Sequence, residues 1–341
     1  MSEPASIPPA ARPERRSRLH GAIGLVGVYG LVLALFVLGS AISPEFLTSH
    51  NLLNTVQAVA LLGIVSVGVA FITFSQHYVD LSVPGIMALA GIIAVSALPY
   101  GFAASLAAGL AAGLAVGLVN GWVVGYLRLN PIIWTLAMAS VLSGVIRKAY
   151  AGAQVYPDAA TPAGRAFLDL YHAAVVGPVS LPLAILAVMA VAAHLLMRHT
   201  GFGAQLRLTG SSYEVARMTG VDVRRSVALA FVLSSAASAV AGILLTSFNK
   251  VGAHYVGKGY DFAAITAVVV GGMTLAGGRG SILGVLGGVT VIALMNNVMS
   301  LVRVGDFTFS EFDKAIVQGA VFILVVGVSS YSRRKTGLDD A

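Results

Sequence analysis

Few polar side chains interrupt the long apolar stretches of this sequence, and those few are the candidates for chemistry. Asn120, Asn296 and Asn297 lie inside such stretches, and Asp80 lies near the end of one. Uncharged amides suit weak hydrogen bonds to a hydroxyl-rich solute, so these three Asn residues are predicted to line a pathway for one. The alternative is that each Asn forms a hydrogen bond between helices. For Asp80 the alternative is to cap a helix that begins at Leu81.

Reactive groups for catalysis or metal binding are scarce. The chain has no Cys, which excludes a disulfide framework, a thiolate metal site and a Cys nucleophile. Its seven His residues have no paired metal-binding spacing, so the sequence predicts neither a cofactor nor a catalytic site. In the glycine-rich run 271–281, Gly272 and Gly277 have the spacing of a phosphate-binding loop, but Gly278 stands where that motif needs Lys. We therefore interpret this run as a tight turn.

The composition indicates a membrane protein. Of the 341 residues, 57% are hydrophobic and 10% are charged, and the mean hydropathy is +0.87. Soluble domains contain about 25% charged residues. Lipid accepts this apolar surface, whereas a water-soluble fold of this size could not bury it. The net charge of +7 is explained by membrane topology rather than by nucleic acid, because the positive residues cluster at loops and termini.

About ten apolar segments are predicted to span the membrane, which gives an all-α integral membrane protein. Segments 81–98 and 262–276 are short, which is typical of broken or re-entrant helices. Ten spans put both termini on one side. About two-thirds of the 21 Lys and Arg residues then fall in the cytoplasm, as the positive-inside rule requires. The predicted spans are 23–42, 56–75, 81–98, 103–127, 131–149, 179–197, 226–248, 262–276, 282–302 and 313–330.

The segments outside the spans define the domain organisation. The basic, proline-rich N-terminus is predicted to be disordered. The apolar run that follows it is too long for a signal peptide, so no cleavage is expected. A short helix is predicted near residues 166–171. The predicted units are a cytoplasmic tail 1–22, a transmembrane domain 23–331 with an external connection 150–178 and a cytoplasmic connection 198–225, and a cytoplasmic tail 332–341.

The cytoplasmic connection 198–225 contains signals for a short isolated helix. Ser211 and Glu214 have the spacing of a capping box, Gly220 can end the helix, and Asp222 can cap the next one. A helix this short is marginal alone and gains stability by docking on another protein. The alternative is an interfacial helix that only shortens the loop. The predicted segment consists of Ser212, Tyr213, Glu214, Val215, Ala216, Arg217, Met218, Thr219 and Gly220.

Five glycines at four-residue intervals form a stripe along the predicted span 103–127. Small residues at this spacing let another helix approach closely. The sequence leaves open whether that helix belongs to the same subunit. The five are Gly109, Gly113, Gly117, Gly121 and Gly125.

Several of these segments together resemble the permease subunits of binding-protein-dependent carbohydrate ABC importers, the ribose, xylose, arabinose and autoinducer-2 class. The run 200–221 resembles the cytoplasmic loop of that family, of the form T-x-F-G … G-x-N-x-x-A-A-R-x-S-G-I. Ser212, Val215 and Thr219 replace the usual Asn, Ala and Ser. Further matches follow in the expected order over about residues 50–330: 79–83 with Pro84 for the usual Gly, Asn120-Gly121, 127–131 with Asn130 for a Pro, 271–281, and Asn296-Asn297.

The resemblance implies a transport function that depends on partners. The family's loop carries a coupling helix that docks on a separate ATPase subunit, so 212–220 is expected to contact an ABC ATPase. A periplasmic solute-binding protein is expected to deliver the sugar to the outer face. A second permease subunit, identical or different, is expected to complete the pathway in the lipid of a bacterial inner membrane. The chain itself has no ATPase motif and is not expected to be an enzyme.

Two other classes remain as alternatives. An ion-coupled secondary transporter of a small polar solute needs ionisable or unwound coordinating groups near the membrane midplane. Apart from His194, which itself lies near a span end, the sequence places no Asp, Glu, Lys or His deep within a predicted span. A membrane enzyme needs a catalytic pair at membrane depth, and the sequence suggests none.

Overall fold

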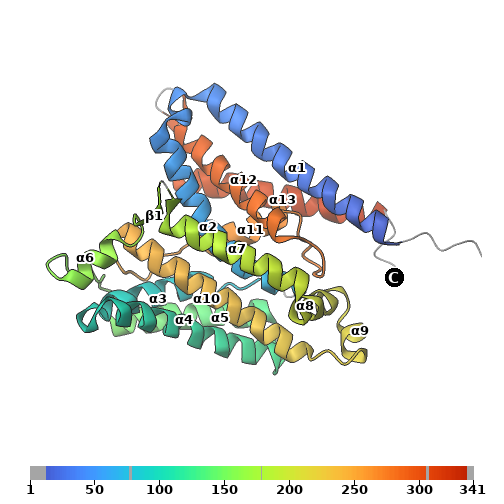
Figure 1. Cartoon of the computed structure of the whole chain (residues 1–341), viewed down its shortest axis with the longest axis horizontal. Coiled ribbons are helices and arrows are strands. Elements are labelled where there is room, and N and C mark those ends of the chain that lie inside the picture. Colours follow the sequence, from blue (N-terminus) through green and yellow to red (C-terminus); the bar gives the residue numbers. More distant parts are fainter. Residues whose placement is uncertain (1–12, 77–78, 178, 305–306, 336–341) are drawn as a thin grey trace, which may run out of the picture.

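The computed structural model describes residues 13–76, 79–177, 179–304 and 307–335 (Figure 1). Within these ranges almost all regular structure is helical, so the predicted all-α membrane fold is confirmed. The elements are α1 (Pro13–Ile42), η1 (Pro44–Leu47), α2 (Ser49–Phe74), α3 (Val83–Ser96), η2 (Leu98–Tyr100), α4 (Phe102–Gly125), α5 (Pro131–Ala149), α6 (Pro162–Asp169), β1 (Ala174–Val176), β2 (Val179–Ser180), α7 (Leu181–His199), α8 (Gly201–Ser211), α9 (Tyr213–Met218), α10 (Val223–Asn249), α11 (Tyr260–Val270), α12 (Ile282–Leu301), β3 (Arg303–Val304), β4 (Phe307–Thr308) and α13 (Glu311–Lys335).

Seven helices in the described part of the chain are long and apolar enough to cross a membrane: α1 from Gly24, α2, α4, α5, α7, α10 and α12. Two further apolar helices, α3 and α11, are shorter, with 14 and 11 residues. These two correspond to the segments 81–98 and 262–276 that were predicted to be broken. Helix α13 covers the last predicted span.

Two terminal helices extend into the segments predicted as tails. Helix α1 begins at Pro13, inside the predicted tail 1–22. Helix α13 continues to Lys335, past the predicted boundary at 331. Residues 1–12 and 336–341 lie outside the described residues.

The two long connections also differ from the prediction. The connection 150–178 contains α6, which starts at Pro162 rather than near residue 166, because Thr161 Oγ1 accepts a hydrogen bond from Gly164 N at 3.0 Å and caps the helix there. A two-stranded antiparallel pair, β1 and β2, follows it. The connection 198–225 contains two helices, α8 and α9, rather than one.

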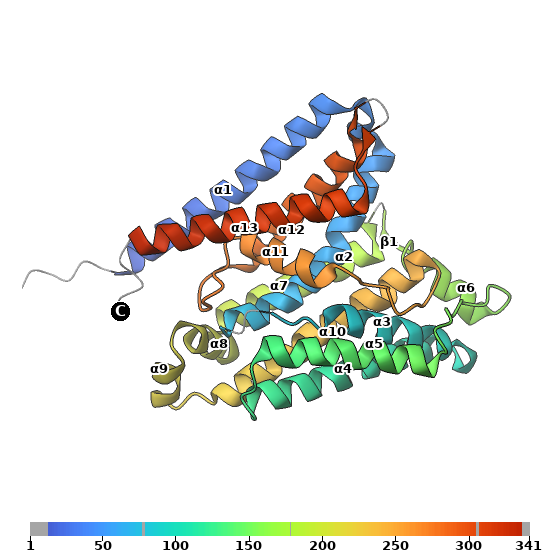
Figure 2. The same cartoon turned by 180° about the vertical axis from the view of Figure 1, so that it is seen from behind.

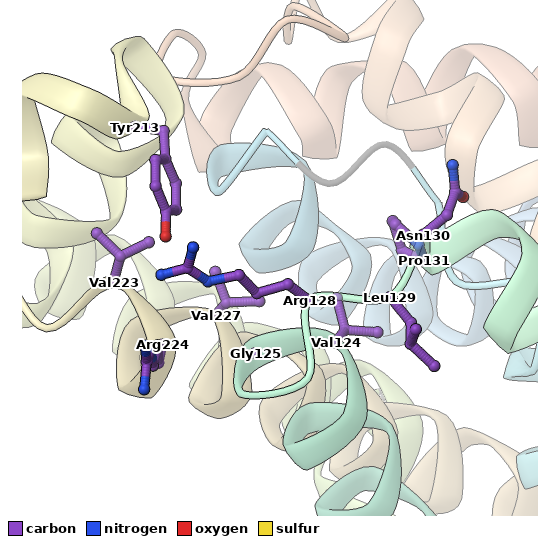
Figure 3. Close-up of a pocket in the computed structure, with 10 residues that line it drawn as sticks. All are labelled: Val124, Gly125, Arg128, Leu129, Asn130, Pro131, Tyr213, Val223, Arg224 and Val227. Atoms are coloured by element: carbon purple, nitrogen blue, oxygen red, sulfur yellow. The ribbon is translucent and has the colours of Figure 1, made fainter.

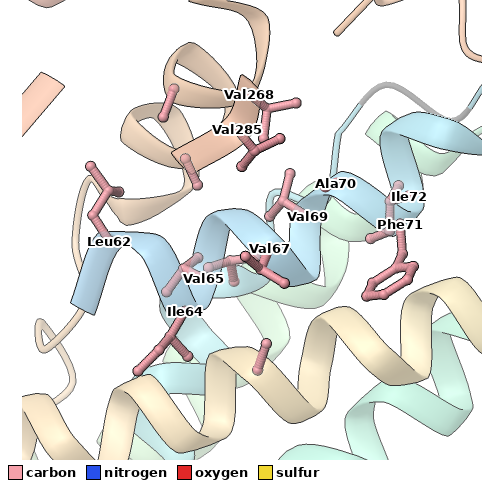
Figure 4. Close-up of a cluster of buried hydrophobic side chains, with 14 of the residues drawn as sticks. Leu62, Ile64, Val65, Val67, Val69, Ala70, Phe71, Ile72, Val268 and Val285 are labelled. Atoms are coloured by element: carbon pink, nitrogen blue, oxygen red, sulfur yellow. The ribbon is translucent and has the colours of Figure 1, made fainter. Parts of the chain in front are cut away.

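Helix α2 is the centre of the molecule. Its residues from Ala60 to Phe74 are all buried, as expected for a helix that is apolar on every side. It packs against α7, α10, α11 and α12. In the buried cluster of Figure 4, its Leu62, Val65 and Val69 lie among side chains that include Val268 of α11 and Val285 of α12. Movement of α2 would therefore displace helices on both sides of it.

Eight of the other helices in the described ranges form two groups on either side of α2. One group consists of α3, α4, α5 and α10, and the other consists of α1, α11, α12 and α13 (Figures 1 and 2). Helices α8 and α9, the start of α1 and the end of α13 lie toward one end of the molecule, and α6 with β1 lies at the opposite end. The described chain therefore begins and ends on the same side as α9.

The glycine stripe of α4 packs within this subunit, mainly against α10. A Cβ atom at Gly121 would lie 2.5 Å from the carbonyl oxygen of Ala228, and one at Gly125 would lie 2.6 Å from that of Arg224. Gly113 and Gly117 meet the same helix, and Gly109 meets Ala90 of α3. The glycine stripe therefore faces helices α10 and α3 of the same chain, where small residues let the backbones approach closely.

Candidate functional site

The short helix α9 is built by its own caps. Ser212 is extended at its start, and its Oγ accepts a hydrogen bond from Val215 N at 3.3 Å. At the other end Gly220 has φ +81, a left-handed conformation that suits Gly. Asp222 Oδ1 then accepts a hydrogen bond from Arg225 N at 3.1 Å and caps α10, as predicted.

The predicted capping box was wrong by one residue. Ser211 ends α8, where its Oγ donates a hydrogen bond to Arg207 O at 2.9 Å, and it is Ser212 that caps α9. The third residue after this cap is Val215, so Glu214 does not complete a box. The sequence missed α8 because its three glycines, Gly201, Gly203 and Gly210, give this segment a low helical propensity, although Thr200 caps it.

Helix α9 has one face against the protein and one face free. Ala216 is completely buried, while Val215 and Met218 have exposed fractions of 48% and 85%. Large apolar side chains on a helix at the end of the molecule are suited to a protein contact. The arrangement therefore presents an apolar surface on a short, capped support.

An arginine holds α9 to the turn between α4 and α5. The guanidinium of Arg128 lies 5.3 Å from the centre of the Tyr213 ring, a cation–π contact. Asn130 caps α5 in the same turn, since its Oδ1 accepts a hydrogen bond from Ile132 N at 2.9 Å. A cavity of about 190 Å³ lies between these elements and α10 (Figure 3). It is lined by Val124, Gly125, Arg128, Leu129, Asn130, Pro131, Tyr213, Val223, Arg224 and Val227.

The glycine-rich run 271–281 is the tight turn that the sequence predicted. Gly272, Gly277 and Gly278 have φ values of +83, +82 and +69. Gly278 N donates a hydrogen bond to Phe74 O at 3.1 Å, at the end of α2. A Cβ atom at Gly210 of α8 would overlap that same Phe74 oxygen. Three backbones therefore meet here without side chains between them, which joins α8 to α2 and to the turn before α12.

Asn120 lies in a buried chain of hydrogen bonds rather than beside an open space. It is completely buried, and its Oδ1 accepts a hydrogen bond from Trp134 Nε1 at 2.9 Å. Its Nδ2 donates to Ser82 Oγ at 2.9 Å, and that hydroxyl donates to Asp80 Oδ1. The chain joins α4 to α5 and to the segment before α3. The sequence missed Ser82 and Trp134, because nothing in the spacing shows which helices are neighbours.

Asp80 does not cap a helix at Leu81. Its Oδ1 accepts a hydrogen bond from Ser82 N at 2.9 Å, and α3 begins only at the next residue, Val83. The carboxylate therefore orders the turn that leads into this short helix, while Leu81 N donates to Thr135 Oγ1 at 3.0 Å. Asp80 Oδ2 is buried, with no hydrogen-bond partner in the described part of the chain.

The two neighbouring amides of α12 differ. Asn297 and Asn51 of α2 exchange two hydrogen bonds, with N···O distances of 2.7 and 3.1 Å, so Asn297 joins helices. Asn296 is half-buried, and its Oδ1 has no hydrogen-bond partner among the described residues. Of the three Asn residues predicted to line a pathway, Asn296 is thus the one whose side-chain oxygen accepts no hydrogen bond from the described residues.

Comparisons with known proteins identify relatives along nearly the whole chain. A family model described as a branched-chain amino acid transport system permease component matches residues 51–326. The chain is similar to the L-arabinose ABC transporter permease protein of Azospirillum brasilense, with 32% identity over 333 residues, 96% of this chain and 94% of the relative. It is also similar to the ribose import permease protein of Escherichia coli K12, with 31% identity over 307 residues, 88% of this chain and 91% of the relative.

Proposed function

Since this chain belongs to the family of branched-chain amino acid transport system permease components, we propose that it is the membrane-spanning subunit of an ABC importer for a monosaccharide or related polyol. The family description mentions amino acids, but the relatives named above are permeases for ribose and L-arabinose. Similarity to both over about nine-tenths of the chain supports a sugar as the solute. An ion-coupled secondary transporter has no such support.

Transport in this proposal is driven by a separate ATPase subunit that docks on α9. The observation that carries it is the geometry of that helix, with Ala216 buried and Met218 85% exposed between two caps. A six-residue helix is marginal in water alone, so its exposed apolar side chains are best explained by a partner. The segment 212–220 is therefore assigned the coupling role. In this proposal the chain forms part of the transport pathway, and ATP hydrolysis occurs on the separate ATPase subunit.

The remaining partners follow from the ends of the molecule. The end with α9 faces the cytoplasm of a bacterium in this proposal, which also puts both termini there. The opposite end, with α6 and β1, receives a periplasmic solute-binding protein. A second permease subunit, identical or different, lies beside the chain in the inner membrane and completes the pathway. Asn296 is retained as a pathway candidate, because its side-chain oxygen is unpaired within the described residues.

Site-directed crosslinking tests this assignment. We expect Met218→Cys, in the otherwise Cys-free chain, to crosslink with the ABC ATPase encoded beside its gene, in membranes that contain both. Tyr100→Cys is the matched control, because Tyr100 is 84% exposed but belongs to η2, where α3 ends and α4 begins, away from α9. Sugar uptake into vesicles should require the ATPase and survive a proton uncoupler. Crosslinks from position 100 rather than 218, or uptake abolished by the uncoupler, would contradict the proposal.

A further inference from the structure

Three arginines surround the cavity beside α9 without acidic partners. Arg128 and Arg224 line the cavity of about 190 Å³, and a smaller neighbouring cavity of about 130 Å³ adds Arg217. The only ion pair in the described ranges joins Lys314 to Glu311, far along the sequence. Asp222 also lines the smaller cavity, but its Oδ1 caps α10. The site therefore keeps a net positive charge that its own residues do not neutralise.

The backbone at Arg128 is held in an unfavourable conformation. Its φ is +57, in the left-handed region where Gly is the usual residue and where other residues cost about 1 kcal/mol or more. Figure 3 shows the side chain extending from this turn toward Tyr213, with Arg224 on α10 below it. The turn therefore directs a guanidinium across the cavity, although Gly would fit that backbone with less strain.

The floor and the edges of the cavity add two further features. Val124 of α4 and Val227 of α10 make part of its lining apolar. The first turns of α5 and α10 border it with Pro131 and Val223, so the positive ends of two long helices contribute as well. Guanidinium groups above an apolar floor suit a ligand with an anionic head and a hydrocarbon tail.

The depth of the cavity indicates where such a ligand would come from. Trp122 and Tyr126, near the end of α4, are 56% and 43% exposed, and they lie in the last two turns before Arg128. Exposed Trp and Tyr at the end of an apolar span mark the level of the lipid headgroups. A cavity at this level opens where the phosphates of the bilayer lie.

We propose that this cavity binds the phosphate-bearing headgroup of an anionic phospholipid, with Arg128 and Arg224 as its phosphate ligands. Arg217, on α9, faces the same ligand from the neighbouring cavity. The lipid would then join the α4–α5 turn, the start of α10 and α9 through one shared anion. This site is separate from the proposed solute pathway, adjoins the segment 212–220 that is proposed to contact the ATPase, and goes beyond the proposed transport function.

Lipid titration of the purified full-length chain in a neutral detergent tests the proposal. Phosphatidylglycerol should raise the thermal unfolding temperature, phosphatidylcholine should raise it less, and inorganic phosphate at the same concentration should have little effect. In the Arg128→Gln/Arg224→Gln double variant, the apparent affinity for phosphatidylglycerol should fall about tenfold or more. Arg225→Gln is the matched control, since Arg225 follows Arg224 on α10 but lines neither cavity.

Native mass spectrometry of the same samples gives a second measurement, the number of anionic lipids retained. If the double variant does not fold, Arg224→Gln alone serves, because Arg224 is exposed on a long helix and its backbone is unstrained. Equal retention by wild type and variant would overturn the proposal. So would inorganic phosphate acting as well as the lipid. Loss of ATPase binding with unchanged lipid retention would assign the arginines to an acidic protein surface instead.

Discussion

Replacing Asn120 by Ala separates a structural amide from one that contacts the solute. The substitution removes the acceptor of Trp134 Nε1 and the donor to Ser82 Oγ, two hydrogen bonds of 2.9 Å each. Hydrogen bonds between membrane helices contribute about 0.6 kcal/mol on average and up to about 1.7 kcal/mol. The loss is therefore about 1–3 kcal/mol of unfolding free energy, and the unpaired indole N–H increases it within that range.

Asn296→Ala is the matched control for this experiment, because it removes the same group from a position where the side-chain oxygen is unpaired in the described structure. Its effect on the unfolding free energy should be below about 1 kcal/mol, within the range of a substitution that breaks no bond. Unfolding of both variants in mixed micelles, followed by the denaturant midpoint, gives the comparison. Sugar uptake in vesicles gives the KM for each.

The two assays together decide the roles of the two amides. We expect Asn120→Ala to lose stability with an unchanged KM, and Asn296→Ala to keep its stability while its KM rises. The reverse result, with wild-type stability and a raised KM for Asn120→Ala, would refute the assignment of Asn120 as a residue that joins helices through hydrogen bonds. It would also restore the pathway role that the sequence predicted for it.

Three further experiments test the packing. Gly121→Ala should be less stable than Gly144→Ala by about 1–3 kcal/mol of unfolding free energy, because only the Cβ at position 121 meets another helix and the gain in helix propensity cancels between the two; thermal unfolding measures the difference. A double-mutant cycle on Asn51→Ala and Asn297→Ala should give a coupling energy of about 1–2 kcal/mol, and a value near zero would contradict the paired amides. Gly210→Ala should uncouple uptake from ATP hydrolysis, since its Cβ would separate α8 from α2; unchanged sugar transport per ATP would contradict this.

Sequence patterns predicted what depends on local chemistry. The lengths of the apolar runs gave most of the helices, and the two short segments were found as α3 and α11. Asp222 and Gly220 were correctly assigned as helix signals, because each acts on the backbone within a few residues of itself. The exact start of α9 was missed by one residue, since Ser211 and Ser212 are both good caps and only packing chooses between them.

Contacts between distant segments could not be predicted in the same way. The glycine stripe indicated that another helix packs closely against α4, but not that this helix is mainly α10 of the same chain. Asn120 and Asn297 looked alike in sequence to Asn296, and they differ because Ser82, Trp134 and Asn51 happen to face the first two. An amide in an apolar helix has two possible uses, and the choice is made by the tertiary structure.

The position of α9 suggests how a short helix can act on a large bundle. Pressure on a six-residue helix would simply unfold it if it were held only by its caps. Tyr213 is held by Arg128 of the α4–α5 turn. Helix α8, which directly precedes α9, contains Gly210, and both Gly210 and Gly278 contact the end of α2. Backbone contacts without intervening side chains transmit displacement with little compliance. In the proposed transporter, force applied at α9 would therefore reach α2, which contacts both groups of helices.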